Sequence, residues 1–236
     1  MELIASPPPY SGPWVMAQTW LDLLFAHWPV PPEALRPHLP PELPVDTYEG
    51  MGWVGITPFV ATVRPRGLPT VQRFPELNVR TYTTVDGRPG IWFFSLDAGS
   101  APAVLGARLT YRLPYFRAAM TVERDATTVR YRSERKGASW AATYAPTGPP
   151  APAAPGTLDH FLTERYALYT TGFGRVLRAD IQHPPWPLQA ATASITRNTM
   201  APVELPVREP LLHFARRQDV LIWAPAPLSR SRRDRR

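Results

Sequence analysis

The chain has 236 residues, enough for one large domain or two small ones, and 44% of them are hydrophobic, enough to fill a sizeable core. It contains no cysteine, which excludes disulfides, thiolate zinc sites and cysteine nucleophiles and fits a reducing cytoplasm. The segment 229–236 holds five arginines and supplies much of the net charge of +7, so the body is too weakly basic to favour nucleic-acid binding.

The N-terminal part shows no secretory signal. Its most apolar segment, 20–28, is too short to span a bilayer and contains Asp22. We therefore expect a cytoplasmic protein without membrane contact. Residues 1–13 are interpreted as an extension, 14–228 as one domain and 229–236 as a basic, disordered tail. The proline-rich segment 147–156 is either a linker or a long surface loop within one domain.

Strand patterns dominate the chain in order from residue 51. Runs of β-branched and aromatic residues predict strands over 51–65, 74–85, 91–98, 106–113, 115–124, 127–135, 138–145, 165–171, 175–183 and 213–224. Helices are predicted over 31–39 and 157–166, and 188–200 is ambiguous. This pattern favours a mainly β fold: a closed or nearly closed antiparallel β-barrel with an internal pocket and a few short peripheral helices.

The strand at 74–85 carries polar residues on one face. Glu76, Asn78, Arg80 and Tyr82 alternate with apolar neighbours such as Leu77. The polar face either meets water or lines the barrel interior. The segment 91–98, which includes Asp97, has bulky apolar residues on both faces, which favours burial of its neighbour. Buried charges would then have to be paired.

Other candidate residues lie on neighbouring strands. Arg108 and Arg112 share one face of the predicted strand 106–113, where they could pair with acids in the barrel wall or grip a bound carboxylate. His27 lies at a strand end before prolines, a position more often structural, and is kept as a candidate ligand contact. No two of the five histidines have metal-ligand spacing, so we expect no metal and no cofactor.

Four motifs carry a family resemblance. They are "LLFAHWPVPPEALRPHLPPEL", "FPELNVRTY", "GIWFFSLDA" and "LPYFRAAM". In this order they resemble the YqjF-like family of unknown function (domain of unknown function 2071), which is placed in the acetoacetate decarboxylase-like superfamily. The resemblance covers roughly residues 15–225. It implies a mainly β, barrel-like fold with an internal pocket in a single domain.

The resemblance also bears on chemistry. The decarboxylases of the superfamily use a Schiff-base lysine after a Gly-Phe-Pro or similar turn. In this chain Pro114 resembles the proline of that turn, and Tyr115 and Phe116 stand in place of the lysine pair. Glu76 resembles one of the pocket acids of the decarboxylases. The single lysine, Lys136, lies in a charged hairpin turn, where its ammonium is solvated, whereas a Schiff-base amine must be desolvated or lie beside another cation in a pocket. We therefore predict that the chain is not a Schiff-base decarboxylase.

Two functions follow. The first is an enzyme that binds a small, acidic metabolite through Arg80 or Arg108 and moves protons through Glu76, Asp97 or Tyr115. Asn78, Arg112 and His27 complete the candidate binding set. The second is a non-catalytic module that binds or senses a small molecule in the same pocket. A homo-oligomer is left open.

Overall fold

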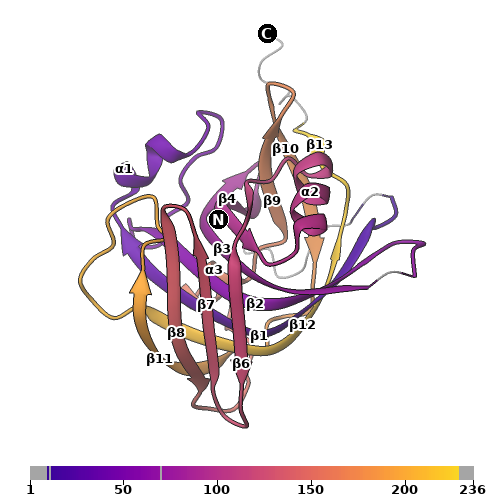
Figure 1. Ribbon diagram of the computed structural model, residues 1–236. Coiled ribbons are helices and arrows are strands. Elements are labelled where there is room, and N and C mark those ends of the chain that lie inside the picture. The colour runs from indigo at the N-terminus through magenta and orange to yellow at the C-terminus, as the bar shows by residue number, and fades with distance from the viewer. Residues whose placement is uncertain (1–9, 11, 70, 229–236) are drawn as a thin grey trace.

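The computed structural model describes residue 10 and residues 12–69 and 71–228 (Figure 1). The predicted basic tail and most of the predicted N-terminal extension lie outside these residues. The strands are β1 (Met16–Val30), β2 (Gly52–Pro65), β3 (Gln72–Val85), β4 (Arg88–Ala98), β5 (Tyr115–Arg117), β6 (Ala119–Arg124), β7 (Val129–Arg135), β8 (Ala138–Pro146), β9 (Ala167–Gly172), β10 (Arg175–Gln182), β11 (Gln189–Asn198), β12 (Leu211–Ile222) and β13 (Ala226–Pro227). The helices are α1 (Pro32–Leu35), the 3₁₀ helix η1 (Arg36–His38), α2 (Ala101–Thr110) and α3 (Leu158–Thr163).

Strand pairing closes a ring. β1 to β4 pair in sequence order, β9 and β10 continue the sheet from β4, and β12 pairs with both β1 and β10. β4 pairs in parallel with β5 and β9, whereas every other strand pair of the described residues is antiparallel. The prediction of a mainly β, closed fold with a few short helices is therefore confirmed, with these two parallel pairings as a departure from it.

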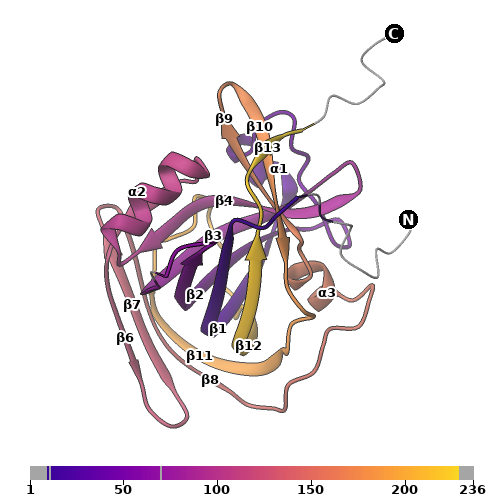
Figure 2. The ribbon, with the colours of Figure 1, turned by 90° about the vertical axis from the view of Figure 1, so that its right-hand side faces the viewer.

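A second layer covers the outside of this ring. From β12 the sheet continues through β11, β8, β7 and β6, which curve around β1 to β4 (Figure 2). The core between the two layers includes Leu24 and Leu77 from the ring and Trp140 and Tyr144 from the outer layer. A separate core, which includes Phe25 and other side chains of β1 to β4, fills the interior of the ring.

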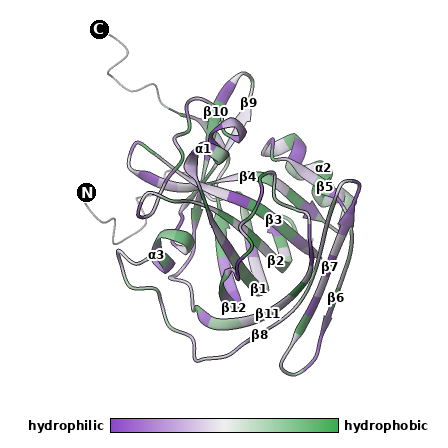
Figure 3. Cartoon of the chain, turned by 90° about the vertical axis from the view of Figure 1, so that its left-hand side faces the viewer, coloured by the Kyte–Doolittle hydropathy of each residue, from purple (hydrophilic) through white to green (hydrophobic). Residues whose placement is uncertain are grey.

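Burial on both faces explains the mixed composition of the central strands. Hydrophilic residues are interspersed with hydrophobic ones along β2 and β3 (Figure 3). Glu76 is 4% exposed and Arg80 is 5% exposed, so the polar face of β3 does not meet bulk water. Of the two interpretations of this strand, the one that places polar residues inside the fold is therefore confirmed.

Turn and cap chemistry placed most elements correctly. Asp86 and Gly87 both have positive φ, 51° and 71°, as a type I′ hairpin turn between β3 and β4 requires. The hairpins β7–β8 and β9–β10 lie where they were predicted. The Thr157 hydroxyl accepts a hydrogen bond from the His160 amide and caps α3, the helix expected over 157–166.

The predicted strand over 106–113 is wrong. Residues Ala101–Thr110 form helix α2, which begins at Ser100, whose hydroxyl accepts a hydrogen bond from the Ala103 amide. Pro102 lies in the first turn, and the segment that follows is rich in alanine and leucine, both strong helix formers. Alternation alone could not separate this short helix from a strand.

Two segments that the sequence left open pair with other parts of the chain. The ambiguous segment 188–200 forms strand β11, which pairs with β8 and β12. The proline-rich segment 147–156 connects β8 to α3, and Ala151 forms a bridge with Leu188. In the described part of the chain, no helix is long and apolar enough to cross a membrane.

Candidate functional site

The polar face of β3 points into the ring. Thr57 of β2 lies directly opposite Asn78, and Phe59 lies opposite Glu76, so these side chains share the interior face. On β1 the same face carries Phe25 and His27. The fold thus places a row of polar groups along one strand, beneath an aromatic core.

Glu76 and Tyr115 form one end of this row. The Tyr115 hydroxyl donates a hydrogen bond to Glu76 Oε1 at 3.0 Å. Burial raises the pKa of Glu76 to about 7, although the hydrogen bonds from Tyr115 and Asn78 act in the opposite direction. The pKa of Tyr115 is raised by burial and by the neighbouring carboxyl, so the phenol keeps its proton. Near neutral pH this pair holds a carboxyl group that can both give and take a proton.

The position of Tyr115 follows from the chain around Pro114. β5 pairs in parallel with β4, and this pairing sets Tyr115 opposite Leu96. Arg108 Nε donates to the Tyr115 carbonyl at 2.6 Å and so fixes the backbone from outside. The short strand β5 therefore positions the Tyr115 phenol on the interior face.

Arg80, Tyr82 and His27 form a second group further along β3. Arg80 Nε lies 3.4 Å from Tyr82 Oη, which lies 2.6 Å from His27 Nε2. If Tyr82 accepts from Arg80, it donates to His27, and the imidazole proton then sits on Nδ1. Burial, with the nearby Arg80 charge, lowers the pKa of His27 well below its usual value, so the ring is neutral.

The charge of Arg80 is not balanced by an acid. Its guanidinium lies 5.3 Å from the Phe25 ring and 5.7 Å from the Tyr82 ring. No carboxylate of the described residues forms an ion pair with it. A buried charge usually has a partner of opposite sign, and Arg80 is therefore prepared to receive an anion.

Several other buried polar atoms on the interior face have no hydrogen-bond partner among the described residues. They are Asn78 Oδ1, Thr57 Oγ1, His27 Nδ1, His213 Nδ1, Trp53 Nε1 and Trp186 Nε1. Native interiors leave few such atoms unsatisfied, and each one calls for an explanation. Their concentration around Arg80 and Asn78 is typical of a site that binds a polar molecule.

The structure separates Asp97 from this group. Asp97 pairs with Leu77 across the sheet, and both side chains point to the outer face. There Asp97 accepts hydrogen bonds from Ser133 Oγ at 3.1 Å and from Arg135 Nε at 2.6 Å. Burial still raises its pKa, the opposite of what the paired Arg135 favours. Its contacts join β4 to β7, away from the interior of the ring.

Arg108 and Arg112 also lie elsewhere, because the segment that holds them is not a strand. Both are exposed, at and just after the end of α2. Arg108 lies over Phe116, and Arg112, which has a φ of 56°, lies over Phe173. Neither side chain joins Glu76, Asn78, Arg80, Tyr115 and His27, the five predicted residues that the ring interior does bring together.

Sequence reasoning missed Arg165, which lies 2% exposed at the end of α3. Its Nη1 lies 2.6 Å from Asp46 Oδ2, and its guanidinium lies 4.9 Å from the Tyr82 ring. Asp46 also accepts a hydrogen bond from Thr84 Oγ1. Asp46 and Arg165 are 119 residues apart, so no local pattern could have linked them.

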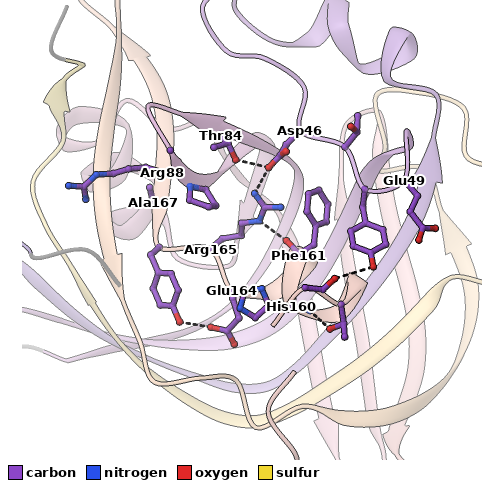
Figure 4. Close-up of a pocket in the computed structure, with 16 residues that line it drawn as sticks. Asp46, Glu49, Thr84, Arg88, His160, Phe161, Glu164, Arg165 and Ala167 are labelled. Atoms are coloured by element: carbon purple, nitrogen blue, oxygen red, sulfur yellow. Dashed lines mark hydrogen bonds and ion pairs between the residues drawn. The ribbon is translucent and has the colours of Figure 1, made fainter. Parts of the chain in front are cut away.

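A cavity of about 580 Å³ lies next to this ion pair (Figure 4). Asp46, Tyr48, Phe161 and Arg165 are among the residues that line it. Phe161 and Arg165 also contact Tyr82, which does not line it. The cavity therefore adjoins the buried polar group through these two side chains. In the described part of the chain, no set of three His, Asp or Glu side chains could hold a metal ion.

A family model with the description "uncharacterized conserved protein", DUF2071, matches residues 17–219. The chain belongs to this family. The uncharacterized protein YqjF of Bacillus subtilis (strain 168) is 48% identical over 222 residues, which cover 90% of this chain and 92% of that protein. The predicted YqjF-like resemblance is thereby confirmed.

Solved structures extend the likeness at the level of the fold. The enduracididine biosynthesis enzyme MppR, complexed with pyruvate, superposes with a TM-score of 0.65 at 12% identity, over 96% of this chain and 92% of MppR. The acetoacetate decarboxylase of Legionella pneumophila superposes with a TM-score of 0.63 at 12% identity, over 96% of this chain and 94% of that chain. An acetoacetate decarboxylase-like enzyme of Sphingomonas wittichii RW1 superposes with a TM-score of 0.64 at 16% identity, over 92% of this chain and 94% of that chain.

The lysine of this DUF2071 protein lies outside its polar interior. Lys136 is exposed in the turn between β7 and β8, in the outer layer. Tyr115, which follows Pro114, occupies the interior instead and contacts Glu76. The side chain that meets the buried acid is thus a phenol.

Proposed function

We propose that this protein binds a small, carboxylate-bearing metabolite inside the ring, with Arg80 as the partner of the carboxylate. The observation that carries the proposal is the buried Arg80 guanidinium, which has no acidic partner among the described residues. A guanidinium binds a carboxylate through two parallel hydrogen bonds, and burial strengthens that interaction.

Acid–base chemistry is the activity that we assign to this site. The Glu76 carboxyl, with a pKa of about 7, exchanges a proton with the bound molecule, and Tyr115 positions that carboxyl through its hydrogen bond. A module that only binds would neutralise its acids with arginine, as Asp97 is neutralised by Arg135 on the outer face. Glu76 has no such partner among the described residues, which favours the enzyme over the sensing module.

The chemistry proposed is non-covalent. An amine that forms a Schiff base must be desolvated or lie beside another cation in a pocket. Lys136, the one lysine of the chain, is an exposed turn residue. We therefore exclude Schiff-base decarboxylation from the proposal.

Two further observations support a small-molecule site. The MppR structure, which shares the fold, contains pyruvate. The cavity beside Asp46 and Arg165 is lined by Arg165, whose guanidinium contacts the Tyr82 ring of the buried polar group. We also propose that residues 14–228 act as one domain, because β12 closes the ring with β1 and β10, and that the protein is cytoplasmic.

Calorimetric titration with butyrate and pyruvate tests the proposal. Arg80→Met should weaken the binding of both acids by at least about 10-fold, since a charge-assisted hydrogen bond is worth roughly 1.5–3 kcal/mol. Arg130→Met, at an exposed position of β7, is the matched control and should bind as the wild type does. Failure of the wild type to bind either acid at millimolar concentration, or equal binding by Arg80→Met, would overturn the proposal.

A further inference from the structure

Along β3, the unpartnered polar groups of the ring interior separate into hydrogen-bond donors near Arg80 and acceptors near Asn78. Near Arg80 the unpartnered atoms include the indole N–H of Trp186 and the Nδ1 of His27, which is a donor when Tyr82 donates to Nε2. Phe25 lies within 6 Å, between ring centroids, of both His27 and Trp186, and the Arg80 guanidinium is also close to it. These donors therefore surround one region, which suits an anionic group.

The neighbouring position along β3 presents an acceptor instead. Asn78 lies beside the Glu76 carboxyl and lowers its pKa, as an amide N–H that donates to the carboxylate does. The amide oxygen, Oδ1, is thus left as a buried acceptor with no partner among the described residues. Asn78 is 6% exposed, so this oxygen cannot rely on bulk water.

Thr57 adds a second unpartnered oxygen beside the first. It is fully buried, it lies directly opposite Asn78 on β2, and its Oγ1 has no partner among the described residues. Directly opposed residues in an antiparallel pair have Cβ atoms about 4.5–5.5 Å apart. Asn78 Oδ1 and Thr57 Oγ1 can therefore receive the same ligand group.

A keto acid fits this arrangement less well than a hydroxy acid. Its carbonyl oxygen only accepts hydrogen bonds and would leave Asn78 Oδ1 unpaired, whereas a hydroxyl donates one to that oxygen. Asn78 and Arg80 are two residues apart on the strand, roughly 7 Å between Cα atoms. A hydroxyl on the third or fourth carbon of a short acid spans that separation.

We propose that the ligand is a short hydroxy acid, with its carboxylate on Arg80 and its hydroxyl on Asn78 Oδ1 and Thr57 Oγ1. This inference rests on the proposed function and narrows its substrate class. The hydroxyl then lies beside Glu76, the group to which we assign proton transfer. A buried acceptor selects strongly against a molecule that lacks the matching donor.

The test compares four acids in calorimetric titrations at pH 7: 3-hydroxybutyrate, 4-hydroxybutyrate, butyrate and acetoacetate. One of the hydroxy acids should bind at least about 10-fold more tightly than butyrate and acetoacetate. Binding of all four with equal affinity would overturn the hydroxy-acid inference and leave the carboxylate site intact. Binding of none would overturn the proposed function and this inference with it.

Variants of Asn78 and Thr57 test whether these two residues cause the preference for a hydroxy acid. Asn78→Leu and Thr57→Val should each reduce the ratio of hydroxy-acid to butyrate affinity, and Thr57→Val nearly preserves side-chain shape. Ser95→Ala is the matched control, because Ser95 is also buried with an unpartnered hydroxyl but lies opposite Val79 on the outer face. It should leave the ratio unchanged. An unchanged ratio in both Asn78→Leu and Thr57→Val would contradict the assignment.

Discussion

The Tyr115 hydroxyl donates to Glu76 Oε1 across the interior of the ring, at 3.0 Å. Glu76 comes from β3 and Tyr115 from the short β5, which pairs in parallel with β4. The contact therefore depends on the chain direction after Pro114. It sets a buried acid beside a phenol that keeps its proton, and the properties of Glu76 follow from this pairing.

Removal of the phenol hydroxyl should raise the pKa of Glu76 further above its value of about 7. The Tyr115 hydrogen bond stabilises the ionised carboxylate, while burial destabilises it. In Tyr115→Phe only the stabilising contact is lost. Carbon-13 NMR of labelled glutamate, with Glu76→Gln to assign the signal, measures this pKa.

Tyr144→Phe is the control for this measurement. Tyr144 is also buried, but its hydroxyl donates to the Asp22 carbonyl in the other core. The pKa of Glu76 should not change in this variant. A pKa that stays constant or falls in Tyr115→Phe would show that the hydrogen bond does not control the acid.

Stability should fall as the pH rises through the window between the unfolded and folded pKa values of Glu76. The unfolded carboxyl titrates near 4.5 and the folded one near 7, so between these values the folded state binds more protons than the unfolded state. Raising the pH then favours unfolding, by up to about 3 kcal/mol in total. Urea unfolding from pH 4 to 8 measures the slope.

Glu76→Gln isolates this effect from other titrating groups. Glutamine does not titrate, so the variant should lose less stability than the wild type between pH 4.5 and 7. Because the amide can still accept a hydrogen bond from Tyr115, packing is largely retained. Parallel stability curves for the two proteins over this window would contradict the raised pKa.

The sequence predicts the fold better than it predicts the site. Hairpin turns such as Asp86-Gly87 and the Thr157 cap are local signals, and they placed their elements correctly. The alternation on β3 identified Glu76, Asn78 and Arg80 as one face, since strand geometry has period two. The face that they share could be predicted, but whether it was buried depended on the outer layer.

The errors came from long-range contacts and from one mistaken element. Arg108 and Arg112 were placed on a strand face because the segment alternates, yet Ser100 caps a helix there. Asp97 is adjacent in the strand to Leu96, which faces the interior, so its own side chain faces outward. Its partner Arg135 lies 38 residues later. Arg165 meets Asp46 only through the closed fold. No local pattern encodes such pairs.

The Asp46–Arg165 ion pair should show strong coupling in a double-mutant cycle. Asp46→Asn leaves the Arg165 guanidinium buried without its acid and should cost about 2–4 kcal/mol of unfolding free energy, somewhat less than for a fully buried pair because Asp46 is partly exposed. Arg165→Met leaves the Asp46 carboxylate without its main partner. The double variant should be more stable than the sum of the single effects predicts. Urea unfolding at pH 7 measures all four proteins.

Additive effects in that cycle would show that the pair contributes no coupling energy. Asp219→Asn is a suitable control, since Asp219 pairs with Arg217 at two exposed positions of β12. Surface pairs contribute about 0–1 kcal/mol, so this variant should be almost as stable as the wild type.

Asp97→Asn should lower stability without changing ligand affinity. Asp97 is fully buried and binds Arg135 and Ser133, so the loss of its charge weakens the contact between β4 and β7 and should cost about 2–4 kcal/mol. It lies on the outer face, away from Arg80, so the affinity for butyrate should stay within about twofold of wild type. Urea unfolding and calorimetry on the same preparation measure both quantities, and Arg80→Met, which should lose affinity, is the comparison. A fall in affinity as large as that of Arg80→Met would place Asp97 in the site.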